Sequence, residues 1–162
     1  MKILLEPVSK NNEVILQNLY SLYLHDLSAF TNELNISQKG DFVFDSHHLF
    51  WTGQGVEPYF IKDGDTLIGF ITLLKRPFLK KEFDFAINDI FILNKYRGKG
   101  YGIPALKEVF SNHSGSYFVI ELAVNKAAVQ FWKKVYGQLS IEYNEISQEV
   151  DSENCLIQTF NI

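Results

Sequence analysis

The chain has 162 residues, of which 46% are apolar and 15% aromatic, with 15 lysines and arginines against 19 aspartates and glutamates. This composition excludes a disordered chain, and the length predicts one folded domain with a sizeable core. The formal net charge of −4 disfavours a general nucleic-acid binder, which needs a basic surface to neutralise phosphates. Small cationic or neutral partners fit this charge better.

The cysteine content and the apolar segments indicate in which cellular compartment the protein is expected. Cys155 is the single cysteine and cannot form an internal disulfide, so a reducing cytoplasm is the simplest location. The apolar start of the chain stops at Glu6 and is too short for a signal peptide. The run Leu67–Leu74 is far below the ~20 residues that span a bilayer, so it predicts a buried strand. We therefore expect a cytoplasmic protein without a membrane partner.

The first third of the chain predicts a strand, a helix and a long loop. The strand is expected at Ile3–Glu6, and Asn11 or Asn12 can cap the helix that follows. The apolar side chains of this helix recur every three or four positions, which predicts a wide apolar stripe: Ile15, Leu16, Leu19, Tyr20, Tyr23 and Leu27. Loop signals dominate Phe30–Gly55, with a helical turn expected within Ser46–Trp51.

The middle of the chain predicts three strands. Tyr59–Ile61 and Leu67–Leu74 should form a hairpin, because Asp63-Gly64 is a strong turn signal. A third strand is expected over 83–93, where the alternation of apolar residues slips at Asn88-Asp89. Because strand side chains alternate with a period of two, the slip predicts either a β-bulge or a change from half-buried to fully buried strand.

The last third alternates helices and strands. The expected elements are a helix containing Ile103, Leu106 and Phe110, a strand at Tyr117–Val124, a helix at Asn125–Tyr136, and strands at Ile141–Ile146 and Cys155–Phe160. Pro104 fits only the first turn of its helix, and Gly137 is expected to end the second helix. The order indicates a mixed α/β fold with antiparallel ends.

The segment Arg97-Gly98-Lys99-Gly100-Tyr101-Gly102 lies between an expected strand and an expected helix. Its alternate glycines let the backbone approach a ligand, while the loop amides and the positive helix end attract an anion. The dinucleotide-binding pattern fails because Ile103 occupies its last glycine position, and the phosphate-loop pattern lacks its Gly-Lys-Ser or Gly-Lys-Thr. The alternative interpretation is an ordinary glycine-rich turn.

Two motifs support the ligand interpretation. Arg97-x-x-Gly100-x-Gly102, after the strand and before a helix, resembles the acyl-CoA loop of the GNAT N-acetyltransferase superfamily. The segment Asn125–Lys134 is similar to that family's later Asn, small residue, Phe-Tyr-Lys stretch, although Trp132 replaces the tyrosine. The element order also resembles the family from Ile3 to Phe160. The sequence looks closest to a small bacterial branch of predicted acetyltransferases that carries Phe-Trp.

The resemblance implies the fold and the co-substrate. The fold is a single α/β domain, 1–162, whose mostly antiparallel central sheet is splayed between the strands at 83–93 and 117–124 and flanked by helices. The co-substrate is acetyl-CoA, and the coenzyme-binding residues implied are Phe91, Ile92, Arg97, Gly98, Lys99, Gly100, Tyr101, Gly102, Asn125 and Trp132. No metal is expected, because the histidines at 25, 47, 48 and 113 lack ligand spacing.

Acetyl transfer to an amine requires a base that takes the amine proton. Asp89 is the first candidate, since desolvation beside the buried run would raise its pKa; alternatively, it is a polar residue that marks the bulge. Glu121, within an apolar strand, is the second candidate, with a buried salt bridge as its alternative. Many family members have a tyrosine at the position of Trp132 that protonates the departing thiolate. The acid therefore stays unassigned, and Tyr136 is expected to pack in the core.

The acceptor side is expected on the first helix. Tyr20, Tyr23 and Asp26 are the candidates that bind an amine, against core packing for the tyrosines and solvent exposure for Asp26. The predicted activity is N-acetylation of a primary amine on a small molecule or peptide by direct attack on the thioester. Two alternatives are an acyl-CoA-binding regulator without turnover and an interaction module with a structural glycine loop. A monomer or homodimer without nucleic-acid partners is expected.

Overall fold

The computed structural model describes residues 1–80 and 82–162. Its main elements are β1 (Ile3–Pro7), α1 (Glu13–Leu27), α2 (Leu49–Thr52), β2 (Val56–Asp63), β3 (Thr66–Lys75), β4 (Phe85–Ile92), α3 (Gly102–Asn112), β5 (Ser116–Leu122), α4 (Lys126–Leu139), β6 (Tyr143–Val150) and β7 (Glu153–Asn161). Short 3-10 turns precede α1 and follow β4. Within the described ranges, no helix combines the length and apolar character that a membrane span needs.

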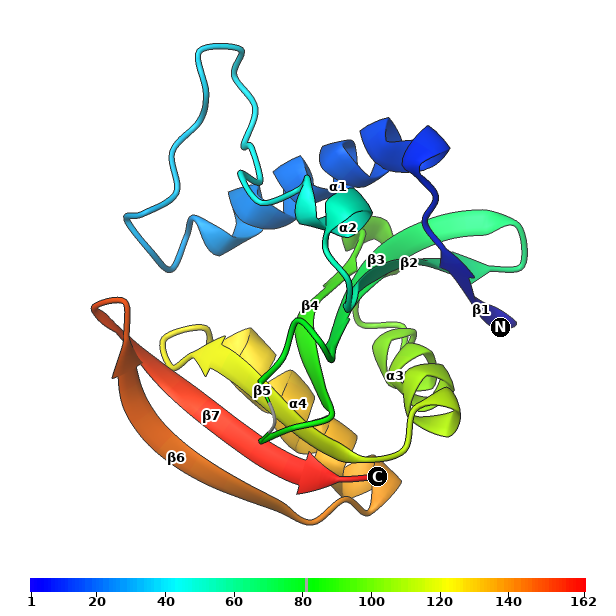
Figure 1. Cartoon of the computed structure of the whole chain (residues 1–162), viewed down its shortest axis with the longest axis vertical. Helices are drawn as coiled ribbons and strands as arrows, with labels where there is room; N and C mark the ends of the chain where they lie inside the picture. The colour runs from blue at the N-terminus through cyan, green and yellow to red at the C-terminus, as the bar shows by residue number, and fades with distance from the viewer. Residues whose placement is uncertain (81) are drawn as a thin grey trace.

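The described strands form one seven-stranded sheet in the order β1-β2-β3-β4-β5-β7-β6 (Figure 1). Neighbouring strands are antiparallel except β4 and β5, which are parallel. Alternate side chains of the sheet join two apolar clusters: Phe60 and Phe70 pack with α1 and α2, whereas Ile61 and Ile71 pack with α3 and α4. The predicted single α/β domain, with a mostly antiparallel sheet flanked by helices, is confirmed.

The predicted hairpin is present as β2 and β3. Its turn contains Gly64 with a φ of +58°, a conformation that glycine adopts readily. β3 is buried from Ile68 to Leu74, which confirms the buried strand predicted from the apolar run. This hairpin supplies the surface against which β4 pairs.

The slip predicted at Asn88-Asp89 is a β-bulge. Thr72 of β3 pairs with Asp89, while the next residue, Leu73, pairs with Ile87, so Asn88 is the extra residue. Without the bulge, Ile87 and Asp89 would point to the same face. Instead Ile87 joins the α3–α4 cluster, whereas Asp89 is hydrogen-bonded to α1. The bulge therefore turns the Asp89 carboxyl toward α1.

The predicted end of α4 at Gly137 is wrong. The helix continues to Leu139, whose side chain still packs against the core. It ends at Ser140 with a φ of +54°, where the amides of Ser140 and Ile141 bond back to the carbonyls of Gly137 and Tyr136. This Schellman arrangement also occupies Ile141, which delays the start of β6 to Tyr143.

Two other predictions need correction. Ile15 is 43% exposed, so the buried stripe of α1 is narrower than its apolar sequence suggests. β4 begins at Phe85 rather than at 83, and the Phe83 ring packs on Phe118 outside the strand, with 5.1 Å between ring centroids. Ile15 and Phe83 thus fit the apolar periodicity of the sequence, but Ile15 is exposed and Phe83 lies outside its predicted strand.

Candidate active site

The parallel strands β4 and β5 are paired where they begin and then separate (Figure 1). Among the described residues, their ladder joins Phe85 to Tyr117 and Ala86 to Phe118. Beyond Ala86, one edge of β4 stays paired with β3 while the other faces an opening. Backbone groups on such an edge can pair with an extended ligand. Phe91 and Ile92, which the family resemblance implies as coenzyme-binding residues, lie on the separated part of β4.

A cavity of about 270 Å³ lies in this opening, and we call it the slot. It brings together Asp89 of β4, Glu121 of β5, Tyr23 of α1, and Asn125 and Trp132 at α4, all of them predicted site residues. The rest of its lining consists of Leu27, Ile87, Asn88, Ile90, Val119, Ile120, Leu122, Ala128 and Cys155. Residues distant in sequence therefore meet where the strands part.

Asp89 is buried and hydrogen-bonded at one face of the slot. It is 9% exposed, and its Oδ2 accepts hydrogen bonds from the Tyr20 hydroxyl at 2.7 Å and from the Asn88 amide at 2.8 Å. The Tyr20 hydroxyl also lies 2.6 Å from the Thr72 hydroxyl. Burial raises the pKa of Asp89 above its ordinary value, although the hydrogen bonds from Tyr20 and Asn88 oppose the rise. A carboxyl in this setting holds a proton more readily than one in water.

Tyr20 of α1 donates a hydrogen bond to Asp89, and Tyr23 of the same helix lines the slot together with Asp89. Burial and the neighbouring Asp89 carboxylate raise the pKa values of Tyr20 and Tyr23 well above the ordinary value. Both phenols therefore keep their protons at neutral pH. Tyr20 is buried and packs face to face on Phe44, with 4.5 Å between ring centroids, whereas Tyr23 lines the slot. Of the two predicted acceptor-binding tyrosines, Tyr23 is the one that lines the slot.

Glu121 lines the slot from the face covered by α4. It is 7% exposed; Oε1 accepts a 2.6 Å hydrogen bond from Gln158, while the buried Oε2 has no partner among the described residues. Gln158 is itself held by Tyr136 at 2.7 Å and donates to Glu145 at 2.8 Å. Burial, with a contribution from nearby Glu145, raises the pKa of Glu121 to about 7. The described contacts thus place Glu121 beside a neutral amide rather than in a salt bridge.

The glycine loop has the geometry of an anion cradle. Gly98 and Gly100 have φ values of +70° and +83°, a region that other residues rarely adopt. α3 begins directly after the loop, and its N-cap residue Tyr101 makes no side-chain capping hydrogen bond. No side-chain cap from Tyr101 therefore occupies the first-turn amides of α3, and a helix start of this kind favours negative charge.

The Arg97 side chain contacts the end of β4 and the helix α1. Its Nε donates to the Ile92 carbonyl at 2.7 Å, and its Nη2 bonds the Asp26 carboxylate of α1. The guanidinium also lies 5.2 Å from the centroid of the Phe91 ring. Asp26, a predicted acceptor-binding residue, thus forms an ion pair with Arg97, and this pair ties the loop to α1.

Gly102 and Tyr101 also have structural roles in the packing of the loop. A Cβ added at Gly102 would lie 2.7 Å from the Phe131 ring, so this glycine allows α3 to approach α4. The Tyr101 hydroxyl donates to Asp63 at 3.0 Å, which anchors the loop to the β2–β3 hairpin. Lys99 is exposed and supplies a positive charge on the loop.

At α4, Asn125 and Trp132 have different tasks. The Asn125 side chain accepts a 3.1 Å hydrogen bond from the Ala128 amide and caps the helix. Trp132 is buried, forms part of the slot wall and packs on Tyr136, with 5.9 Å between ring centroids. Tyr136 is buried in the α3–α4 cluster, so its predicted core position is confirmed.

Sequence reasoning missed Thr72 and Gln158, which support the two slot carboxyls. Thr72 interrupts an otherwise apolar strand, and its position opposite Asp89 is set by the bulge. Gln158 sits at an inward position of β7 opposite Val119. A polar side chain inside an apolar strand was the available signal in both cases.

Residues 16–137 match the pattern of the acetyltransferase (GNAT) family, and the chain therefore belongs to that family. The fold resembles an acetyltransferase from Thermus thermophilus, with a TM-score of 0.72, 13% identity, and coverage of 100% of this chain and 98% of that one. It also resembles an acetyltransferase from Salmonella typhimurium in a structure with acetyl-CoA, with a TM-score of 0.65, 9% identity, and coverage of 99% and 94%.

A third similar structure is a spermidine N-acetyltransferase chimera from Vibrio cholerae and hSSAT, with a TM-score of 0.65, 12% identity, and coverage of 99% of this chain and 96% of that one. Among curated proteins, Exportin-T from Scheffersomyces stipitis is 31% identical over 159 residues, 91% of this chain. The chain spans 15% of the length of that protein. The solved structures, at these low identities, support the fold alone.

Proposed function

We propose that this protein is an N-acetyltransferase that moves acetyl from acetyl-CoA to a primary amine of a small molecule or peptide. The observation that carries the proposal is the slot, a cavity lined by two buried carboxyls where β4 and β5 separate. Asp89 lies toward α1 and Glu121 toward α4. Two carboxyls held in different surroundings suit opposite steps of proton transfer.

Coenzyme binding is assigned to the cradle and the open edge of β4. The amides from Gly98 to Gly102 would hold the pyrophosphate, and Phe91 and Ile92 would pair with the pantetheine arm. Trp132 would form the wall beside it. Acetyl-CoA supplies an activated acetyl thioester. The fit rests on the uncapped start of α3 and on the positive φ values of Gly98 and Gly100.

Asp89 is assigned the role of base. It accepts the proton of the amine as the nitrogen attacks the thioester carbonyl and the carbon–nitrogen bond forms. Tyr20 and Asn88 keep its carboxylate oriented through their hydrogen bonds at 2.7 and 2.8 Å. The raised pKa of Asp89 brings its proton affinity closer to that of an effective base near neutral pH.

Glu121 is assigned the role of acid. As the carbon–sulfur bond breaks, its carboxyl gives a proton to the coenzyme A thiolate, and both carboxyls then return to their starting states by exchange with water. Its pKa of about 7 leaves much of it protonated near neutral pH, and its Oε2 has no partner among the described residues. Tyr23 suits this role less well, because burial raises its pKa well above the ordinary value and makes it a weak acid.

The acceptor is assigned to the α1 side of the slot, next to Tyr23 and Leu27. We place the protein in the cytoplasm, because its single cysteine needs no oxidising compartment. The Phe131-Trp132 pair supports a place in a small bacterial branch of predicted acetyltransferases. Monomer and homodimer remain the two expected states.

The second candidate function is acyl-CoA binding without turnover. It is favoured by Trp132, since an indole cannot protonate a thiolate. The test is coenzyme A release from acetyl-CoA with a panel of primary amines, together with calorimetry of acetyl-CoA binding. We expect amine-dependent release that Asp89→Asn lowers by about 100-fold while coenzyme binding persists. Glu149→Gln, on exposed β6, is the matched control and should leave release unchanged. Binding without release from any amine would favour the regulator, and absence of binding would exclude both.

A further inference from the structure

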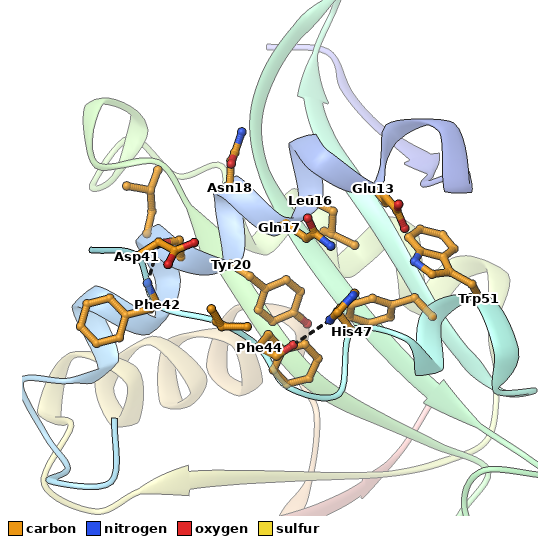
Figure 2. Close-up of a pocket in the computed structure, with 14 residues that line it drawn as sticks. Glu13, Leu16, Gln17, Asn18, Tyr20, Asp41, Phe42, Phe44, His47 and Trp51 are labelled. Atoms are coloured by element: carbon orange, nitrogen blue, oxygen red, sulfur yellow. Dashed lines mark hydrogen bonds between the residues drawn. The ribbon is translucent and has the colours of Figure 1, made fainter. Parts of the chain in front are cut away.

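A second cavity lies away from the slot. It has a volume of about 410 Å³ and opens between α1 and the segment 41–51 (Figure 2); we call it the α1–α2 pocket. No described residue lines both cavities. Tyr20 stands between them, because its ring lines the α1–α2 pocket while its hydroxyl bonds Asp89 of the slot. A molecule in this pocket would therefore leave the slot free.

The floor of the α1–α2 pocket is aromatic. The rings of Tyr20 and Phe44 stack at 4.5 Å between centroids, and Phe50 lies 5.6 Å from Tyr20. Trp51 extends this surface, 6.0 Å from Phe50. Faces of aromatic rings carry partial negative charge and attract cations as well as apolar groups.

Trp51 also contributes a hydrogen-bond donor to the pocket lining. Its indole Nε1 is buried and has no hydrogen-bond partner among the described residues. Figure 2 shows this nitrogen on the side of the ring that faces Gln17 and His47 across the pocket. A buried N–H without an acceptor is unfavourable, so an oxygen of a bound molecule would complete this site.

Two carboxylates line the pocket, together with the imidazole of His47. Glu13 lies near one end and Asp41 near the other (Figure 2), and none of the described lining residues is a lysine or arginine. Asp41 accepts a hydrogen bond from Ser37, which holds its carboxylate in place. The resulting negative field favours a positively charged molecule over a neutral or anionic one.

We propose that the α1–α2 pocket binds a small organic cation, namely an ammonium group on an apolar body that also carries a hydrogen-bond acceptor. The aromatic floor receives the apolar body and the ammonium, the carboxylates of Glu13 and Asp41 attract the charge, and Trp51 donates to the acceptor. This site is independent of acetyl transfer, since it contains neither slot carboxyl and no part of the glycine cradle.

The probe for this site is the benzyldimethyl(2-hydroxyethyl)ammonium ion. It combines a phenyl ring, a permanent positive charge and a hydroxyl, and its quaternary nitrogen cannot be acetylated. Calorimetry without coenzyme should show saturable binding of one ion per chain. Glu13→Gln and Trp51→Phe should each weaken it by about fivefold. Glu149→Gln removes the same charge from exposed β6 and should leave it unchanged.

Fluorescence locates the bound probe. The chain has two tryptophans, so Trp132→Phe leaves Trp51 as the sole reporter, and its emission should change on binding. Saturating acetyl-CoA should not displace the probe. The proposal is overturned by absence of saturable binding at millimolar probe, by equal weakening in Glu149→Gln, or by displacement with acetyl-CoA, which would place the probe in the slot. These outcomes do not depend on whether the protein acetylates amines.

Discussion

Replacement of Glu121 by glutamine tests how the ionisation of this buried carboxyl changes the free energy of unfolding. The glutamine carbonyl can accept the hydrogen bond from Gln158, and the amide nitrogen takes the place of Oε2, which has no partner among the described residues. Packing therefore changes little, whereas the ionisable group is lost. The difference in stability between the two proteins should then depend on pH.

The sign and size of this dependence follow from the pKa. Folding raises the pKa of Glu121 from 4.5 to about 7, so the native state holds this proton more tightly than the unfolded chain. The stabilisation is complete below pH 4.5 and is lost as the pH rises through 7. Between pH 5 and pH 8 it falls by about 2 to 3 kcal/mol. Asp89 also titrates with a raised pKa, but it is the same in both proteins and cancels.

The assay is urea unfolding of both proteins at pH 5 and pH 8. The unaltered protein should lose about 2 to 3 kcal/mol relative to Glu121→Gln between the two conditions. Glu149→Gln makes the same chemical change on exposed β6 and should shift stability equally at both pH values. If the difference between the proteins is the same at pH 5 and pH 8, Glu121 is not held protonated by burial, and its proposed role as acid fails with it.

The other predictions concern catalysis and binding. If Asp89 is the base and Glu121 the acid, activity needs Asp89 deprotonated and Glu121 protonated, so Asp89→Asn should remove the acidic limb of the pH–rate profile and Glu121→Gln the alkaline limb near pH 7. Retention of both limbs in either variant would reject that assignment. Gly100→Val forces a β-branched residue to a φ of +83°, which should abolish acetyl-CoA binding in calorimetry at a stability cost of about 1 to 3 kcal/mol; unchanged affinity would refute the cradle. Tyr23→Ala should raise the KM of the acceptor more than that of acetyl-CoA, with melting measured alongside because loss of the ring can cost about 3 kcal/mol; equal increases would contradict the acceptor assignment.

Local patterns in the sequence predicted the features that depend on local geometry. The broken alternation at Asn88-Asp89 is enough to locate the bulge, because strand periodicity tolerates no extra residue without one. The separation of β4 and β5, implied by family resemblance, is present beyond Ala86. The end of α4 was missed because Gly137 is a strong local stop signal, whereas the packing of the partly buried Leu139 against the core is a tertiary effect.

The direction of long side chains could not be predicted. The guanidinium of Arg97 bonds Asp26 and lies near the Phe91 ring, and no spacing in the sequence indicates these contacts. Helical spacing predicts a core position for Tyr20, and the side chain is buried, yet its hydroxyl holds Asp89. Contacts of this kind depend on how α1 lies across the sheet, and no local pattern records that placement.

The single cysteine of the chain gives the slot a chemical reporter. Cys155 lies in the slot wall and is buried, and burial raises the pKa of its thiol. The thiol therefore stays protonated at neutral pH and reacts slowly with alkylating reagents. A small neutral thiol-selective reagent can modify the chain only at this one thiol, so the rate at which a single mass increment appears measures how often the slot admits a molecule. The rate of that increment would follow occupancy of the slot without any engineered label.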